Sequence, residues 1–587
     1  MFLGFSVGVL FLGALISGLC YRINSPKFHG SLAFLTSAVA LYFLNLTFFE
    51  FIKTGEFSWH LPLFRWIRDF INLELIFKAN GLNLFFALFG AYVSVGINLY
   101  AIKYMTHEKE GFGRFYAFIQ LFIGSYLGLT LSENLFWSYV FFELTGLCSY
   151  QLIAFWYQSD LSSFSAKKAF LMTHIAGYGF LLGALVFTLS PDPKVYQDLI
   201  LAGVLIAVLA KSVQWPLYTW IPYAMNAPTP VSALLHAACL VKCGVYLLFK
   251  FYLLLGGFPE FWKNLLIYLG IFSSLMGVLF ALKQADVKKL LAYHTVSQIG
   301  YMVSGIGLGT SLGLASSLFH TLNHALFKGL LFLVAGILQQ ATHTRDLSLM
   351  GGLASKLPKT TVLYLIGAAS ISGIPGFNGF VSKWMFYQAA IEANHPLAAA
   401  LGLFISTLTT LSFIKVLDTA FLGKLDEKNK QLSEKPFYLM ITGGIILAIP
   451  CVVFGLFPQI AITFLINPAL SLLNLREVNI SFYQLPTVLI GALFILFLGL
   501  GILIYFTWLK PKEIIKETEV FKGGEDEPVF NPTADDFVAD IENRLATFYK
   551  KADPDQYLLK TCSFIEKLIM KVYTTVKKLE QIWSKPC

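Results

Sequence analysis

The chain is a succession of long apolar runs separated by short polar breaks. A membrane-spanning helix needs roughly 20 mainly apolar residues, and runs of about this length continue to position 508. The pattern therefore predicts an all-α, polytopic transmembrane helix bundle with about 15 spans, at 2–21, 31–52, 81–102, 115–131, 134–157, 168–189, 198–215, 228–255, 263–282, 288–308, 312–339, 358–392, 396–422, 436–465 and 485–508.

Proline and glycine interrupt two of these runs. The segment 216–227 begins at Pro216 and continues the run before it, and the run 358–392 contains Gly373 and Pro375. Both residue types free backbone groups that then need protein or water partners, and broken helices of this kind mark ion sites in transporters. We expect two broken helices near the middle of the membrane.

The two breaks lie about five spans apart, and an odd number of spans inverts a repeat in the membrane. The sequence therefore predicts two inverted five-helix repeats, each holding an ion half-channel. The predicted division of the chain is N-terminal helices at 1–110, repeats at 111–255 and 263–422, C-terminal helices at 436–508, and a cytoplasmic tail at 509–587.

The tail differs from the rest of the chain because basic and acidic residues are frequent in it. Apolar residues recur at steps of four and three between Leu558 and Trp583, which predicts an amphipathic helix. That helix would pack on the protein's own body or the bilayer, or dock on a partner subunit.

Composition agrees with a membrane protein. Apolar residues make up 56% of the 587 residues and charged residues 13%, whereas a soluble domain carries about a quarter charged residues. Soluble enzymes are therefore excluded. The net charge of +9 comes mainly from residues between apolar runs, so we expect the lipid bilayer, and no nucleic acid, as its partner.

The loop charges predict an orientation. Seventeen lysines and arginines fall in the short loops on one side and seven on the other. Because cytoplasmic loops carry the excess of positive charge, this distribution places the N-terminus outside and the C-terminus in the cytoplasm of a cell (inner) membrane.

Cofactor motifs are not apparent. Cys239 and Cys243 lie four apart within an apolar run, but a metal or cluster would need more ligands nearby. Small apolar fillers are favoured over a redox role. We expect no metal, no cofactor and no redox centre in this chain.

Ionisable residues inside the apolar runs are the main candidate site. Each costs several kcal/mol unless it is paired or solvated. A lone histidine in a span is usually a hydrogen-bond former, but a set this large favours a proton-transfer row. Its members are Glu143, Lys211, His236, Lys242, His320, His324, Lys328 and Lys383.

Some of these residues have informative spacing. His320, His324 and Lys328 are four apart, so they share one helix face and resemble a proton wire. Glu143 and Lys211 are expected to face each other, because each keeps its charge in an apolar span only beside the other or water.

Three further lysines have simpler predicted roles. Lys250 and Lys263 are expected to extend toward the membrane surface. Lys415 is expected to form a static ion pair with Asp418.

Several stretches carry a family resemblance. AKSVQWPLYTWIPYAMNAPTPVSALLHAACLVKCGVYLL, FHTLNHALFKGLLFLVAG, ENLFWSYVFFELTGLCSY and KQADVKKLLAYHTVSQIGYM resemble the antiporter-like membrane subunits of complex I, Mrp antiporters and membrane-bound hydrogenases. The similarity covers about 80–460, in a large subunit type with a C-terminal extension. It implies a fifth-helix glutamate at Glu143, a broken seventh-helix lysine at Lys211, a connecting lysine at Lys242 and an exit lysine at Lys383.

The resemblance implies the function. The expected function is a proton-translocating, or proton/sodium-translocating, subunit of a membrane redox complex such as a hydrogenase or complex I-type NADH:quinone oxidoreductase. Other membrane subunits and a peripheral redox module are the implied partners. A subunit of an Mrp-type sodium/proton antiporter is the alternative, and a structural scaffold subunit is the alternative of another class.

One sixth-helix run departs from the family. The chain has His174-Ile175-Ala176-Gly177-Tyr178 where the large complex I subunit has an Arg-Val-Gly-Asp-like run. The missing aspartate argues against a carboxylate role at this point. The run GIPGFNGFVSKW and Lys242 resemble Mrp and hydrogenase-type members, and the Gly-Gly-Glu after the last span resembles hydrogenase-type subunits. A hydrogenase-like or related redox complex is therefore favoured, with ordinary complex I close behind.

Overall fold

The computed structural model describes residues 2–61, 74–422, 425, 427–479, 546–549 and 551–555. The chain divides into two compact units, residues 1–537 and 538–587. In the second unit, residues 546–549 and 551–552 are helical. The predicted span at 485–508 and the amphipathic helix at 558–583 lie outside the described residues and stay predictions.

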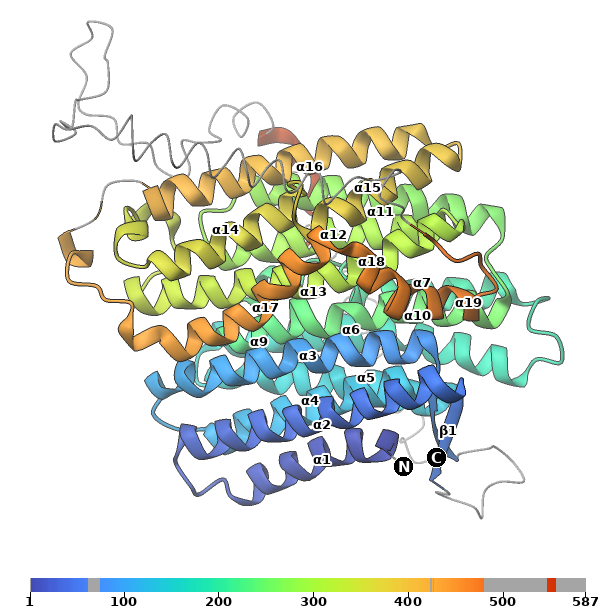
Figure 1. Ribbon diagram of the computed structural model, residues 1–587, viewed down its shortest axis with the longest axis horizontal. Coiled ribbons are helices and arrows are strands. Elements are labelled where there is room, and N and C mark those ends of the chain that lie inside the picture. The colour runs from blue at the N-terminus through green and yellow to red at the C-terminus, as the bar shows by residue number, and fades with distance from the viewer. Residues whose placement is uncertain are drawn as a thin grey trace, which may run out of the picture. The chain divides into compact units, whose positions relative to one another are not determined.

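The first unit is built from long helices that run side by side (Figure 1). Up to the first break these are α1 (Phe2–Leu19), α2 (Pro26–Thr54), α3 (Gly81–Tyr104), α4 (Phe112–Leu131), α5 (Leu135–Ile153), α6 (Asp160–Leu189) and α7 (Gln197–Lys211). They continue with α8 (Ile221–Ala224), α9 (Thr229–Ala233), α10 (Leu240–Leu255), α11 (Glu260–Leu282), α12 (Val287–Gly307), α13 (Ser311–Thr342), α14 (Pro358–Ser372), α15 (Asn378–Glu392) and α16 (Pro396–Val416).

The last described helices of this unit are α17 (Tyr438–Leu456), α18 (Pro458–Ala461) and α19 (Asn467–Leu472). Short 3-10 turns lie at Met105–His107, Ala154–Trp156, Leu347–Leu349, Leu353–Ser355, Glu427–Asn429 and Lys435–Phe437. Nine helices within the described ranges are long and apolar enough to cross a membrane. The predicted all-α polytopic fold is confirmed; the two inverted repeats stay a prediction.

Both predicted helix breaks are present. The helix α7 ends at Lys211, and residues 212–220 form turns before α8. The helix α14 ends at Ser372, and Gly373 has a φ of 80°, a left-handed conformation that favours glycine. The chain re-enters a helix at Asn378. Each break leaves a helix end inside the bundle.

The predicted span 228–255 is not one regular helix. A π-helical segment, η4 (Leu234–Ala238), separates α9 from α10. The Cys239 amide donates to the carbonyl of Leu234 five residues back, and the Lys242 amide donates to the carbonyl of Cys239 three residues back. The regular bonding pattern is therefore interrupted beside His236. Two other π segments lie at Leu417–Leu422 and Ile462–Ile466.

Two other predictions of helix structure were incomplete. The run 436–465 was expected to be one span, but α17 ends at Leu456 and Pro458 opens α18, because proline lacks the amide that would continue the first helix. The loop before α3 was assigned no element. It contains an antiparallel pair, β1 (Phe57–Leu61) and β2 (Leu75–Ala79), with Trp59 opposite Phe77.

The helix that carries most candidate histidines lies at the centre of the unit. All of the most apolar 18-residue window of α13 is buried. The helices α3, α12, α14, α15 and α17 all contact α13 (Figure 1). Polar side chains on α13 therefore meet protein on every side, and they can form a row between the two breaks.

Candidate functional site: a row of buried cations

Lys211 is the last residue of α7, and its side chain is fully buried. Its Nζ donates to the carbonyl oxygen of Phe142 at 2.9 Å and to Thr145 Oγ1 at 3.2 Å, both on α5. The Phe142 ring centroid lies 4.3 Å away. Gly146 lies beside the ammonium group, and a Cβ there would lie 3.1 Å from Nζ. The end of the broken helix thus places the side-chain nitrogen of Lys211 against the backbone of α5.

Glu143 points in another direction from the same helix. Its Oε2 lies 2.5 Å from Nδ1 of His174 on α6, and Nε2 of His174 lies 3.1 Å from the hydroxyl of Tyr178. Glu143 Oε1 is buried, with no hydrogen-bond partner among the described residues. A Cβ at residue 177 would overlap Oε1, so Gly177 provides the space for the carboxylate.

Glu143 and Lys211, expected to face each other, make no direct contact, although the charge of Glu143 still acts on Lys211. The described residues contain no ion pair between them, and Glu143 pairs with His174 instead. The physical reason is the geometry of α5. Residues 142 and 145 lie on the face that meets Lys211, whereas residue 143 points from a different face toward α6. Sequence reasoning missed His174 as a partner, although an imidazole in place of the family's charged run was its signal.

Lys242 and His324 form the closest contact between two members of the predicted row. Lys242 is on α10, and its Nζ lies 2.5 Å from Nδ1 of His324 on α13. The same Nζ donates to the carbonyl oxygen of Ala237 in the π-helical segment. Both side chains are fully buried. The π segment therefore presents a backbone acceptor that holds the lysine against the imidazole.

His320 lies one turn before His324 on α13 and connects this helix to the second break. Its Nδ1 is 2.9 Å from the hydroxyl of Ser382 on α15, and its Nε2 is 3.2 Å from Gln298 Oε1 on α12. Ser382 directly precedes Lys383 in the sequence. The histidine is therefore anchored beside the lysine of the second broken helix.

Lys383 is buried on α15, and its ammonium group reaches the C-terminal end of α14, the first half of the broken helix. Its Nζ donates to the carbonyl of Ile371 at 2.7 Å and to Ser406 Oγ at 2.9 Å, with the carbonyl of Ser372 at 3.4 Å. The last carbonyls of a helix lack partners within it and carry partial negative charge. The break therefore creates the acceptors that hold this cation.

The structure leaves two members of the predicted row without hydrogen bonds. Neither ring nitrogen of His236 nor Nζ of Lys328 has a hydrogen-bond partner among the described residues. The Phe332 ring centroid lies 5.8 Å from the His236 ring and 5.8 Å from Lys328 Nζ. The Trp220 ring centroid lies 6.1 Å from that of His236. Phe332 is thus a shared aromatic neighbour of these two side chains.

Two lysines outside the row do not behave as predicted. Lys250 was expected to reach the membrane surface, but it is buried and donates to the carbonyl of Ser132 at 2.5 Å. Lys415 was expected to pair with Asp418, but its Nζ donates to the carbonyls of Leu282 and Gln284. Each lysine meets a helix end, where free carbonyls attract a cation. Lys263 does lie at the surface, 3.5 Å from Glu260.

The arrangement has a simple chemical meaning. Imidazole accepts a proton on one ring nitrogen and releases one from the other. Lys242, His324, His320 and Lys383 therefore bring proton acceptors and donors together from α10, α13 and α15. Among the described residues no hydrogen bond joins Lys211 to Lys242, His324 to His320, or His320 to Lys383, so water would have to bridge those intervals.

Known protein families and relatives match most of the chain. Residues 132–409 match the family profile described as NADH:quinone oxidoreductase/Mrp antiporter, TM, and residues 66–116 match the complex I chain 5 N-terminus. A Na(+)/H(+) antiporter subunit from Alkalihalophilus pseudofirmus is 33% identical over 503 residues, covering 78% of this chain and 62% of the relative. A Na(+)/H(+) antiporter subunit from Staphylococcus haemolyticus is 32% identical over 548 residues, covering 85% and 67%.

Two solved structures have a similar fold. A chain of the archaeal membrane-bound sulfane sulfur reductase, a respiratory membrane complex, superposes with a TM-score of 0.80 at 23% identity, covering 100% of this chain and 96% of that one. A chain of the Mrp complex from Dietzia sp. superposes with a TM-score of 0.72 at 25% identity, covering 100% and 63%. The chain spans between half and about two thirds of the length of the two curated relatives above and of a third, from Bacillus subtilis. It belongs to the NADH:quinone oxidoreductase/Mrp antiporter family of multi-pass membrane proteins.

Proposed function

We propose that this chain moves protons, or protons and sodium ions, across the membrane as one component of a larger membrane complex. The row from Lys211 through Lys242, His324 and His320 to Lys383 would carry the protons, with Glu143 and its partner His174 controlling the occupancy of Lys211. In the predicted orientation the N-terminus is outside and the C-terminus is cytoplasmic.

The contact between Lys242 and His324 carries this proposal. At 2.5 Å one nitrogen donates and the other accepts. If both groups were protonated, two positive charges would touch in a buried site where neither group bonds to a carboxylate among the described residues, which is very costly. The pair therefore favours a single shared proton. A shared proton between groups on α10 and α13 is a step of a transfer chain.

A structural scaffold explains other buried lysines better than this pair. Lys250 and Lys415 each donate to carbonyls at a helix end, which is a stabilising role without proton movement. Lys242 also donates to a carbonyl, that of Ala237, but in addition it contacts His324, which can itself gain and lose a proton. A capping role alone would not need this second, titratable partner. This difference favours translocation for the row and a capping role for the two other lysines.

The type of complex is inferred from the proteins that the chain resembles. A chain of the archaeal sulfane sulfur reductase, a respiratory membrane complex, has a similar fold. This likeness supports a redox-driven complex with further membrane subunits and a peripheral redox module. An Mrp-type sodium/proton antiporter is the alternative, which the names of the curated relatives support.

Transport in vesicles that hold the native complex tests the proposal. Lys242→Met and His324→Leu should abolish or strongly lower proton movement, followed with a pH-sensitive dye, while the complex still assembles. Lys250→Met is the matched control, because Lys250 is a buried lysine on the same helix outside the row. Equal transport in all three variants would favour the scaffold.

The energy source separates the two types of complex. Proton movement that requires the complex's electron donor would support the redox assembly. Proton movement driven by an imposed sodium gradient alone would support the antiporter.

A further inference from the structure

A group of hydroxyls lies next to Lys383 on the side of the 393–395 loop. Ser406 on α16 accepts from Lys383 Nζ at 2.9 Å and donates to the carbonyl of Ser372. The hydroxyl of Tyr387 donates to the carbonyl of Gly402 at 3.4 Å, and the hydroxyl of Tyr301 donates to the same oxygen. No hydrogen bond joins Tyr387 to Ser406 among the described residues; each hydroxyl is held by a backbone carbonyl.

The positions of these groups define a direction. Tyr387 lies one turn after Lys383 on α15, and Gly402 lies one turn before Ser406 on α16. Residues 393–395 join the two helices, so both steps lead from Lys383 toward that loop. Lys383 and Ser406 are buried, whereas Tyr387 is half-buried. The hydroxyls therefore continue from a buried cation to a partly accessible side chain.

A glycine allows the two tyrosines to converge. A Cβ at residue 402 would lie 3.0 Å from the Tyr387 ring and 3.3 Å from the Tyr301 ring. Because Gly402 has no side chain, both rings approach the α16 backbone and share one carbonyl oxygen. The convergence brings both phenols to the stretch of α16 that also holds Ser406.

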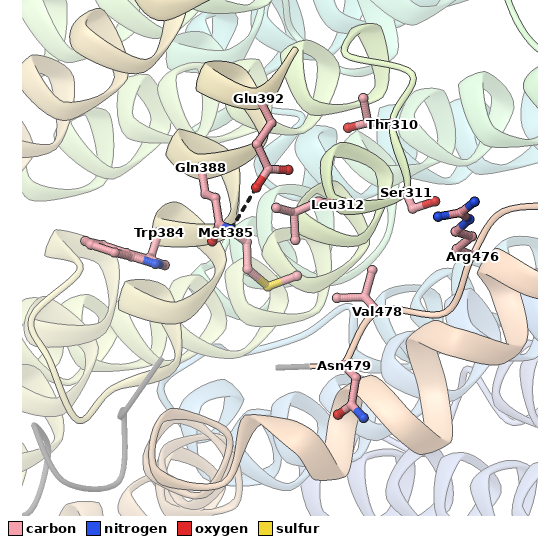
Figure 2. A pocket seen from close by; sticks show the side chains of 10 residues that line it. All are labelled: Thr310, Ser311, Leu312, Trp384, Met385, Gln388, Glu392, Arg476, Val478 and Asn479. Carbon is pink, nitrogen blue, oxygen red and sulfur yellow. Dashed lines mark hydrogen bonds between the residues drawn. The ribbon is translucent and has the colours of Figure 1, made fainter. Parts of the chain in front are cut away.

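A pocket reaches the same part of α15. Its volume is about 300 Å³, and Figure 2 shows its lining residues, with Gln388 bonded to Glu392 at 2.8 Å. Met385 and Gln388, which flank Tyr387 in the sequence, line the pocket, whereas Tyr387 itself does not border it. Polar side chains that include Thr310, Glu392 and Asn479 also line the pocket, so water is a suitable occupant.

We propose that Tyr387, reached through Ser406, is the group that takes the proton from Lys383 to water at the 393–395 end of α15 and α16. This inference rests on the proposed function, in which Lys383 is the last cation of the row. It adds two residues that the sequence analysis did not identify and gives the outlet a direction.

The proton balance requires only hydroxyl rotation and water. The Lys383 ammonium gives one proton to Ser406 Oγ, and the original Ser406 proton passes to the oxygen of Tyr387. The original Tyr387 proton then passes to water. Each hydroxyl ends with one proton, Lys383 is neutral, and the water has gained the proton. Rotation of the Ser406 and Tyr387 hydroxyls away from their backbone acceptors starts the transfer.

The test compares two tyrosines in vesicles that hold the native complex. Tyr387→Phe removes the relay hydroxyl, and Tyr364→Phe is the matched control. The hydroxyl of Tyr364 also donates to a carbonyl of α16, that of Phe413 at 2.5 Å, but toward the other end of the helix. Tyr387→Phe should lower the rate of proton movement roughly tenfold, the scale of losing one hydrogen bond from a transfer step. Tyr364→Phe should leave the rate near that of the original protein.

The outcomes separate this inference from the proposed function. Unchanged transport in Tyr387→Phe, or an equal loss in Tyr364→Phe, would overturn the inference. If Lys383→Met abolishes transport while Tyr387→Phe does not, the relay alone is wrong. If Lys383→Met also leaves transport unchanged, the proposed function is wrong as well. If Tyr387→Phe fails to assemble, Ser406→Ala provides the same comparison, because it interrupts the relay one step earlier.

Discussion

Nζ of Lys242 on α10 lies 2.5 Å from Nδ1 of His324 on α13, and a backbone carbonyl of the π-helical segment holds the lysine there. Two groups that both titrate are thus in contact across two helices, at the centre of the bundle. The relationship makes the pair act as one unit, since the charge on one group sets the cost of charging the other.

The first prediction follows from that unit. Lys242→Met and His324→Leu should each lower proton movement at least about tenfold. The double variant should lose little more than the worse single variant, because both changes interrupt one step. Dye-based rates in vesicles, normalised to the amount of assembled complex, measure the effect. Losses that multiply independently would show that the two residues act at separate steps.

The second prediction uses a glycine to move a carboxylate without changing its charge. A methyl group at residue 177 would occupy the place of Glu143 Oε1. Because this carboxylate is the flexible end of its side chain, it can move aside, and Gly177→Ala should still fold and assemble. The displaced carboxylate should slow transport. Gly18→Ala is the control, because a Cβ at residue 18 meets no atom within 4 Å among the described residues. Normal transport in Gly177→Ala would mean that the position of the carboxylate is not important.

The third prediction concerns the partner of Glu143. Because Glu143 pairs with His174 and not with Lys211, a double-mutant cycle of Glu143→Gln and His174→Leu should give a coupling of about 0.5–3 kcal/mol in the transport barrier. The corresponding cycle of Glu143→Gln and Lys211→Met should give a smaller coupling. The same vesicle rates provide both values. A larger coupling with Lys211 would indicate that the carboxylate swings between two partners during turnover.

The fourth prediction concerns stability. Lys415 donates to two carbonyls at the end of α11, and its removal leaves buried acceptors without this donor. Lys415→Met should lower the free energy of unfolding by about 1–3 kcal/mol. Thermal unfolding of the purified complex measures the loss. Asp418→Asn should have no comparable effect, since Asp418 is exposed and the lysine is held by carbonyls. A larger loss of stability in Asp418→Asn than in Lys415→Met would instead support the ion pair between the two residues that the sequence predicted.

The positions of the helices could be predicted because length and apolar content determine what crosses a membrane. The two breaks could also be predicted, since Pro216, Gly373 and Pro375 are local signals that act on the backbone directly. The direction of Glu143 could not. A single residue on α5 can meet either neighbouring helix, and the choice depends on the space that Gly177 leaves on α6.

Other features leave little trace in the sequence. The π-helical segment at Leu234–Ala238 contains neither proline nor glycine, and its apolar pattern is that of an ordinary span. The capping roles of Lys250 and Lys415 depend on carbonyls more than 100 residues away. These lysine–carbonyl contacts depend on how distant helices pack, and residue spacing within one helix cannot predict them.

The π-helical segment also has a consequence for changes in chain length. His236 and Lys242 are six residues apart, which in a regular α-helix places two side chains about 240° from each other. Here His236 meets Phe332 and Lys242 meets His324, both on α13. The π turn, with its bond from residue 239 back to residue 234, takes up one more residue than an α turn, and this brings both side chains to α13. Deleting one residue here would close the segment into a regular α-helix with little rotation of its two ends, but it would remove the turn in which the Ala237 carbonyl meets Lys242. A one-residue deletion is therefore expected to spare the fold and break the contact between Lys242 and His324, whereas exchanges among small apolar side chains should preserve both.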